Sequence, residues 1–154
     1  MILIGLPASG KTTFYRERYA ATHDHISKDL MRHARRPGKR QHDLLAASFT
    51  AGRSVVVDNT NPDQGVRAPI IALARERGAR VVGYFFEATA PEALRRNRAR
   101  EGRERVPDVA IFTVRKHLEP PQRSEGFDEL YLVRMQETDR TFVVTPMPGA
   151  ANEK

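Results

Sequence analysis

The chain has 154 residues, of which 40% are hydrophobic and 29% are charged. This length and this balance are typical of one globular domain with a single hydrophobic core. No apolar run approaches the roughly 20 residues that a membrane-spanning helix needs, so we expect a cytoplasmic protein that does not bind membranes. The chain has no cysteine, which excludes disulfide bonds, thiolate zinc sites and cysteine nucleophiles.

The net charge is strongly positive, because 26 Lys and Arg residues stand against 19 Asp and Glu residues and give a formal charge of +7. Such a balance favours anionic partners, either nucleotides or nucleic acid. A generally basic surface without a specific partner is the alternative. The positive residues are concentrated in residues 32–40 and 95–105, and both segments flank the candidate site residues described below.

Short apolar runs alternate with helical patterns along the chain. Strands are expected over residues 1–6, 25–27, 54–58, 80–87, 130–133 and 141–144. Continuous apolar runs such as residues 54–57 favour a parallel sheet that helices cover on both faces. We therefore predict an α/β fold with one domain over residues 1–145, followed by a disordered tail over residues 146–154.

The sequence predicts where two of the helices begin. Apolar residues recur at helical spacing over residues 66–74, and Gly78 can end that helix. Asn61 and Pro62 predict its start, as an N-cap and a first-turn proline. A second helix is expected to begin at residues 89–92, which have the spacing of a capping box.

Residues 5–12, Gly-Leu-Pro-Ala-Ser-Gly-Lys-Thr, match the pattern G-x-x-x-x-G-K-[ST] between an expected strand and an expected helix. In such a phosphate-binding loop (P-loop), backbone N–H groups surround phosphate oxygens, and the following helix directs its positive end at the same anion. Lys11 is expected to reach the β- and γ-phosphates of ATP, and the Thr12 hydroxyl is expected to ligate Mg²⁺. The residues expected to contact ATP here are Gly5, Pro7, Ala8, Ser9, Gly10, Lys11, Thr12 and Thr13.

A P-loop alone does not identify the reaction, but two strand ends bear on it. After the second strand, Asp29 could accept the proton of an attacking hydroxyl, and Arg32 could hold an anion on the acceptor. An Asp near a helix start, with an exposed Arg one turn later, is the simpler alternative. After the third strand, Asp58 could hold a magnesium-bound water or position a catalytic side chain.

The arginine-rich segment over residues 95–105 is a candidate lid. Arg96 and Arg100 are four residues apart, so they are expected on one helix face. A basic lid of this kind can close over ATP and offset negative charge in the transition state. A solvated basic face is the alternative.

At these residues the sequence resembles the 5′-hydroxyl polynucleotide kinases, the kinase domains of phage and animal end-healing enzymes. The similarity covers nearly the whole chain. The motifs that carry it are Asp29 with Arg32, Asp-Asn-Thr-Asn-Pro over residues 58–62, Arg96 with Asn97 and Arg100, Val106-Pro107, and Glu125-Gly126-Phe127. Two residues depart from the family, since Ala8 stands where Gly is usual and Thr12 replaces the commoner Ser.

The resemblance implies an adenylate-kinase-like P-loop fold that uses ATP and Mg²⁺ to phosphorylate the 5′-OH ends of DNA or RNA in nucleic-acid repair. The implied catalytic residues are Asp29 as general base, Lys11 and Arg100. Arg96 and Arg100 would contact ATP, and the acceptor would be bound by Asp29, Arg32, Asp58 and Asn59. The phosphatase or ligase modules that often accompany such kinases are absent from the sequence, so 3′-end healing or sealing is expected from a separate protein.

Two other classes of function stay open. The first is a small-molecule kinase, for example a zeta-toxin-like nucleotide-sugar kinase, because that architecture also places an acid after the second strand. The second is a non-catalytic nucleic-acid-binding module with a residual P-loop. The joint presence of Lys11, Thr12, Asp29 and Asp58 argues against the second class.

Overall fold

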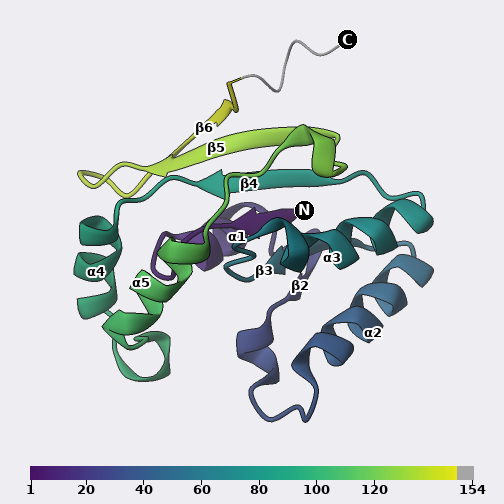
Figure 1. Cartoon of the computed structure of the whole chain (residues 1–154), viewed down its shortest axis with the longest axis horizontal. Helices are drawn as coiled ribbons and strands as arrows, with labels where there is room; N and C mark the ends of the chain where they lie inside the picture. The colour runs from purple at the N-terminus through teal and green to yellow at the C-terminus, as the bar shows by residue number, and fades with distance from the viewer. Residues whose placement is uncertain (149–154) are drawn as a thin grey trace.

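The computed structural model describes residues 1–148, and its central feature is a six-stranded sheet (Figure 1). The strand order is β2-β3-β1-β4-β5-β6, and every neighbouring pair is parallel except β5 with β6. The strands are β1 Ile2–Ile4, β2 His23–Ile26, β3 Ser54–Asp58, β4 Val82–Phe86, β5 Glu129–Met135 and β6 Phe142–Pro146. The predicted α/β class is confirmed, with one antiparallel edge strand that the sequence reading did not anticipate.

Helices cover both faces of the sheet, as expected. The α-helices are α1 Lys11–Arg18, α2 Pro37–Thr50, α3 Gln64–Glu76, α4 Ala90–Arg98 and α5 Asp108–His117. Three short 3-10 helices, η1 Lys28–Met31, η2 Gly102–Glu104 and η3 Arg123–Glu125, lie in the connections. Among the described residues, no helix combines the length and the apolar character that crossing a bilayer requires.

The alternation of strand residues decides which helix covers which face. Successive side chains of a strand point to opposite sides of the sheet, so Val55 and Val57 enter the core formed with α2 and α3. Val56 points the other way, into the core formed around Phe14 of α1. A third apolar cluster, centred on Ile111, packs α5 and α4 against Leu6 of the P-loop. This cluster holds the base of the candidate lid next to the P-loop.

The start of α3 differs from the prediction. Its N-cap is Asp63, whose side chain accepts from the Val66 backbone N–H at 2.8 Å. Asn61 is buried, adopts a left-handed backbone with φ 44°, and donates through Nδ2 to the Leu3 carbonyl oxygen at 2.7 Å. Asn61 therefore fastens the segment after β3 to β1 instead of capping a helix. The capping box at Thr89 and Glu92 is confirmed.

The first residues of the expected tail over residues 146–154 are hydrogen-bonded to the sheet. Pro146 pairs with Tyr131 in the β5–β6 ladder, and the Met147 backbone N–H donates to the Leu130 carbonyl oxygen at 3.1 Å. These residues therefore extend the last strand pairing. Residues 149–154 of the expected tail lie outside the described residues.

Candidate active site

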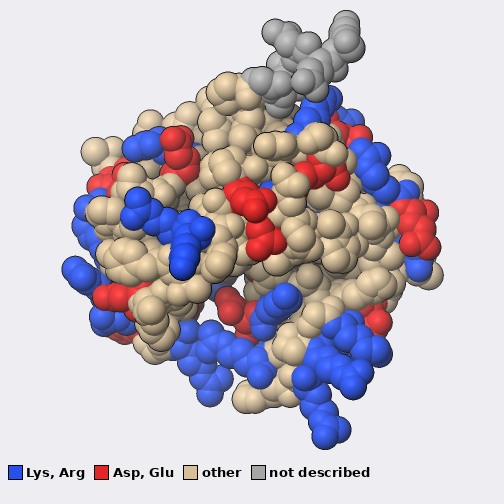
Figure 2. Space-filling view, in the orientation of Figure 1, with Lys and Arg blue, Asp and Glu red and all other residues tan. Residues whose placement is uncertain are grey.

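The candidate site lies where three neighbouring parallel strands end. The P-loop follows β1, η1 follows β2, and the Asp58–Pro62 motif closes β3. In open α/β sheets, ligands bind outside the carboxyl ends of the strands, and all three predicted motifs meet at this edge. Figure 2 shows a hollow on this side of the molecule with Lys and Arg side chains around its lower rim.

The P-loop backbone has the strained turns that a phosphate cradle needs. Gly10 has φ 99°, and a Cβ added there would lie 3.0 Å from the ring of Phe142 on β6. Ala8 also has a positive φ, 62°, a conformation that costs a non-glycine residue about 1–2 kcal/mol. This geometry explains why glycine is usual at the position of Ala8. The Gly5 N–H donates to the Thr60 carbonyl oxygen at 3.0 Å, so the β3 motif supports the loop.

Lys11 is buried and folded back onto its own loop. Its Nζ donates to the carbonyl oxygens of Gly5 at 3.0 Å and Leu6 at 2.6 Å, and to Ser9 Oγ at 3.3 Å. Burial lowers the pKa of Lys11 to about 8, although the negative charge of Asp58 opposes that shift. A buried ammonium held by neutral oxygens lacks a full counter-charge, which a bound polyphosphate would supply. The residues present therefore fit a nucleotide.

A hydrogen-bonded network joins the P-loop to β3 and β2. Asp58 Oδ2 accepts from Thr12 Oγ1 at 2.7 Å and pairs with His25 Nε2 at 2.8 Å. Burial alone would raise the pKa of Asp58, but these hydrogen bonds and the charge of Lys11 hold it below its usual range. The ring of His25 stacks on Tyr15 of α1, with centroids 4.1 Å apart. His25 was not predicted as a site residue, because no local sequence signal shows that a histidine on one strand contacts an aspartate on another.

The oxygen atoms of Thr12 and Asp58 are of the kind that Mg²⁺ prefers. The described residues contain no group of three or more His, Cys, Asp or Glu side chains that could hold a metal ion by themselves. Mg²⁺ commonly keeps several waters and shares substrate phosphates, so a hydroxyl beside one ionised carboxylate suits it. This donor set fits a magnesium–nucleotide complex.

Asp29 lies on η1, which follows β2. Ser27 Oγ accepts from the Asp29 backbone N–H at 3.2 Å, and Asn59 Oδ1 accepts from the Lys28 backbone N–H at 2.8 Å. Asn59 also donates to Gln41 Oε1 on α2 at 2.7 Å, so one amide joins β3, η1 and α2. The exposed Asp29 carboxylate acts electrostatically on Lys11. Asp29 is therefore near enough to Lys11 for the two charges to interact.

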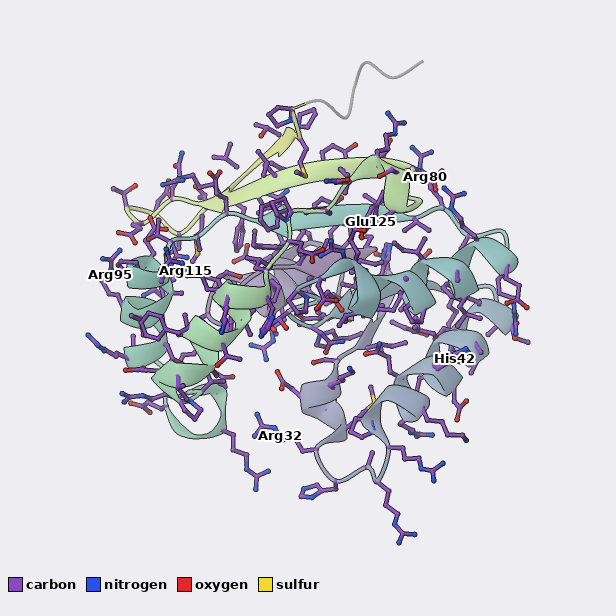
Figure 3. The ribbon with its side chains drawn as sticks, viewed as in Figure 1. Arg32, His42, Arg80, Arg95, Arg115 and Glu125 are labelled. Carbon is purple, nitrogen blue, oxygen red and sulfur yellow. The ribbon has the colours of Figure 1, made fainter. Side chains whose placement is uncertain are left out.

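The predicted arginines separate into two groups. Arg32 Nη2 donates to the Arg103 carbonyl oxygen at 3.0 Å, and Figure 3 shows its side chain extending from η1 toward the lid segment. Arg100 lies beyond the end of α4, donates to the Glu104 carbonyl oxygen at 3.1 Å, and acts electrostatically on Lys11. Arg96 instead faces the β5–β6 hairpin, where it lies 3.8 Å from Glu137. The expected common helix face of Arg96 and Arg100 is therefore wrong, because α4 ends between them.

Asn97, which is fully buried, joins the two ends of the lid segment. Asn97 Nδ2 donates to the Val106 carbonyl oxygen at 2.7 Å, and Asn97 Oδ1 accepts from the Val106 N–H at 3.0 Å. Both backbone groups of Val106 are thus satisfied by one side chain. This contact explains why Asn97 lies between the two arginines of the lid motif.

A buried ion pair between Arg67 and Glu125 supports the segment that follows β3, residues 58–62. Arg67 of α3 is fully buried, and its Nε lies 2.9 Å from Glu125 Oε1. Arg67 also donates to the carbonyl oxygens of Asn61 and Glu119. Glu125, labelled in Figure 3, belongs to the Glu125-Gly126-Phe127 motif. Residues far apart in sequence therefore converge on the turn that supports the P-loop.

The fold and the loop define a P-loop nucleotide-binding protein with the architecture of P-loop kinases. A family model described as an AAA domain matches residues 1–121, and the chain belongs to this family.

Two curated relatives are similar to the chain. One, from Acanthamoeba polyphaga mimivirus, is 29% identical over 140 residues and is named as a bifunctional polynucleotide phosphatase/kinase; the match covers 86% of this chain and 32% of the relative. The other, a bifunctional polynucleotide phosphatase/kinase of Schizosaccharomyces pombe, is 24% identical over 134 residues, with 82% and 31% covered. The chain thus spans about a third of the length of these relatives.

Solved structures share the fold at low identity. Kti12 of Chaetomium thermophilum with ADP-AlF3 has a TM-score of 0.63 and 19% identity, over 90% of this chain and 92% of that protein. A gluconokinase from Sinorhizobium meliloti has a TM-score of 0.62 and 17% identity, over 86% and 80%. These likenesses establish the architecture.

Proposed function

We propose that this chain is an ATP-dependent polynucleotide 5′-hydroxyl kinase that acts on the ends of DNA or RNA in the cytoplasm. The observation that carries the proposal is the placement of η1, from which the Asp29 charge acts on Lys11 while Arg32 reaches the lid. A proton acceptor and an anion-binding cation three residues apart suit a hydroxyl that has a phosphate nearby.

In the proposed reaction, the acceptor hydroxyl oxygen forms a bond to the γ-phosphorus of ATP. The bond from that phosphorus to the β–γ bridging oxygen breaks, and ADP leaves. Asp29 takes the hydroxyl proton, while Lys11 and Arg100 offset the charge on the transferring group. Mg²⁺, when bound with ATP, supplies positive charge at the phosphate oxygens, and Thr12 and Asp58 are the residues that would hold it.

Two further observations support a nucleic-acid acceptor. The curated relatives are named as polynucleotide phosphatase/kinases, and the chain carries a formal net charge of +7, which favours phosphate backbones. The small-molecule kinase alternative draws support from the fold shared with a gluconokinase.

The test is transfer of labelled γ-phosphate from ATP to three acceptors at equal concentration: a 5′-OH oligonucleotide, the same oligonucleotide with a 5′-phosphate, and gluconate. Label on the 5′-OH oligonucleotide alone is the expected result. Label on gluconate alone would replace the proposal with the small-molecule kinase. If no acceptor is labelled although ATP binds, the non-catalytic module is favoured.

A further inference from the structure

A second pocket lies beside the candidate site, between η1 and α2. It has a volume of about 330 Å³, and its apolar wall includes Leu30, Met31, Ala34 and Leu44. Leu30, the residue after Asp29, is a large apolar side chain that is 68% exposed. A volume of this size and an apolar wall suit a flat aromatic group.

The polar groups of this pocket favour an anionic ligand. His25, His33 and Arg40 line it, and no carboxylate is among its described lining residues. Arg36 is the N-cap residue of α2, four residues before Arg40, and no acidic partner of either arginine is found among residues 1–148. Figure 2 shows Lys and Arg side chains gathered over this part of the molecule. An aromatic ring attached to a phosphate matches both properties.

The position of the pocket relates it to the acceptor. Figure 1 shows η1 between α2 and the segment that joins α4 to α5. Arg32 leaves η1 toward that segment, whereas Leu30 and Met31 line the pocket on the α2 side. From Asp29 to Met31 the 3-10 helix rises by about 4 Å, which is less than the length of one extended nucleotide. A strand that begins at Asp29 and crosses η1 would therefore reach the pocket with its next base.

We propose that the η1–α2 pocket binds the base of the second nucleotide of the acceptor strand, and that Arg40 pairs with the phosphate on the 3′ side of that nucleotide. This inference rests on the proposed function and names where the strand runs. It predicts that the enzyme reads beyond the first nucleotide from the 5′ end. Stacking or burial of one base typically changes affinity by a factor of roughly ten or more.

The test compares three acceptors that all carry a 5′-OH: a nucleoside 3′-monophosphate, a trinucleotide, and the same trinucleotide with an abasic second position. For the native protein we expect kcat/KM for the trinucleotide to exceed both other values roughly tenfold. Equal kcat/KM for all three acceptors would overturn the inference and leave the proposed function intact. Failure to phosphorylate any of them would instead refute the proposed function.

Two variants probe the pocket without touching the residues assigned to phosphoryl transfer. Ala34→Phe fills the pocket, and Arg40→Ala removes its cation; both should lower kcat/KM for the trinucleotide to the monophosphate level. Their kcat/KM for the nucleoside 3′-monophosphate should stay native, which also reports correct folding. Arg115→Ala is the matched control, because Arg115 is an exposed arginine on α5 away from this pocket (Figure 3). A native trinucleotide preference in both pocket variants would overturn the inference.

Discussion

The guanidinium of Arg32 donates to the main-chain carbonyl oxygen of Arg103, 3.0 Å away, and so joins η1 to the lid segment. Both residues are exposed, so this contact can be exchanged for a stronger one. A phosphate that enters between η1 and the lid would offer Arg32 charge-assisted hydrogen bonds, which are stronger than a bond to a neutral carbonyl.

Arg32→Ala should therefore impair use of the acceptor and leave ATP binding unchanged. Charge-assisted hydrogen bonds contribute about 1.5–3 kcal/mol, so kcat/KM for a 5′-OH oligonucleotide should fall roughly ten- to hundredfold. The native protein should also prefer a nucleoside 3′-monophosphate to a plain nucleoside, and the variant should lose most of that preference. Initial rates at fixed ionic strength measure both effects. Equal native rates with the two small acceptors would contradict the assignment of Arg32.

Asp29→Asn should lower kcat by roughly 10²–10⁴-fold, the range for a positioned proton acceptor. ATP affinity should persist, because no described hydrogen bond or ion pair links the Asp29 side chain to the P-loop. Single-turnover rates and calorimetric ATP titration measure the two quantities separately. Asp43→Asn on α2 is the control for removing an exposed carboxylate. Lost ATP affinity with an unchanged chemical step would assign Asp29 to the nucleotide instead.

Lys11 predicts a pH dependence of nucleotide binding. Its pKa of about 8 lies below the usual value of 10.5, so the free protein loses this proton above about pH 8. Bound phosphates favour the charged form, and binding must then restore the proton. ADP affinity measured without Mg²⁺ should fall by roughly tenfold between pH 7 and pH 9.

Lys11→Arg serves as the control for this titration. The arginine side chain stays charged throughout the range, so the variant should show no comparable fall in ADP affinity, whatever its absolute affinity. The lowered pKa of Lys11 also makes the stability of the fold depend on pH. Because the folded-state pKa lies below the unfolded value, the contribution of Lys11 to stability should rise with pH between about 8 and 10.5. An identical pH slope in native protein and Lys11→Arg would exclude Lys11 as the titrating group.

Removal of one partner from the Arg67–Glu125 pair should destabilise the fold strongly. Both side chains are buried, at 0% and 7% exposure, and a single buried charge left behind costs about 3–5 kcal/mol. Arg67→Met should therefore lower the free energy of unfolding in urea by that order. Arg67→Met with Glu125→Leu should recover much of the loss. Lys39→Met, which breaks an exposed ion pair with Asp43, should change it by about 1 kcal/mol or less.

The parts of the site that the sequence alone determined are those built from consecutive residues. A P-loop between a strand and a helix depends on local backbone geometry, so residues 5–12 predicted it directly. The positions of Asp29 and Asp58 after strands follow from the rule that parallel strands end at one edge of the sheet. The capping box of Thr89 and Glu92 was predictable for the same reason, because this motif involves only four consecutive residues.

Only the tertiary structure decided which distant side chains meet. His25 reaches Asp58 because β2 and β3 are neighbours in the sheet, and Arg67 meets Glu125 across 58 residues of sequence. Asn61 has the residue type of an N-cap, but burial between β1 and α3 gave its amide a backbone partner that outweighed the local preference. Arg96 and Arg100 do not share a helix face because α4 ends at Arg98, a boundary that the sequence spacing did not reveal. Contacts between distant residues depend on chain topology, which local propensities do not contain.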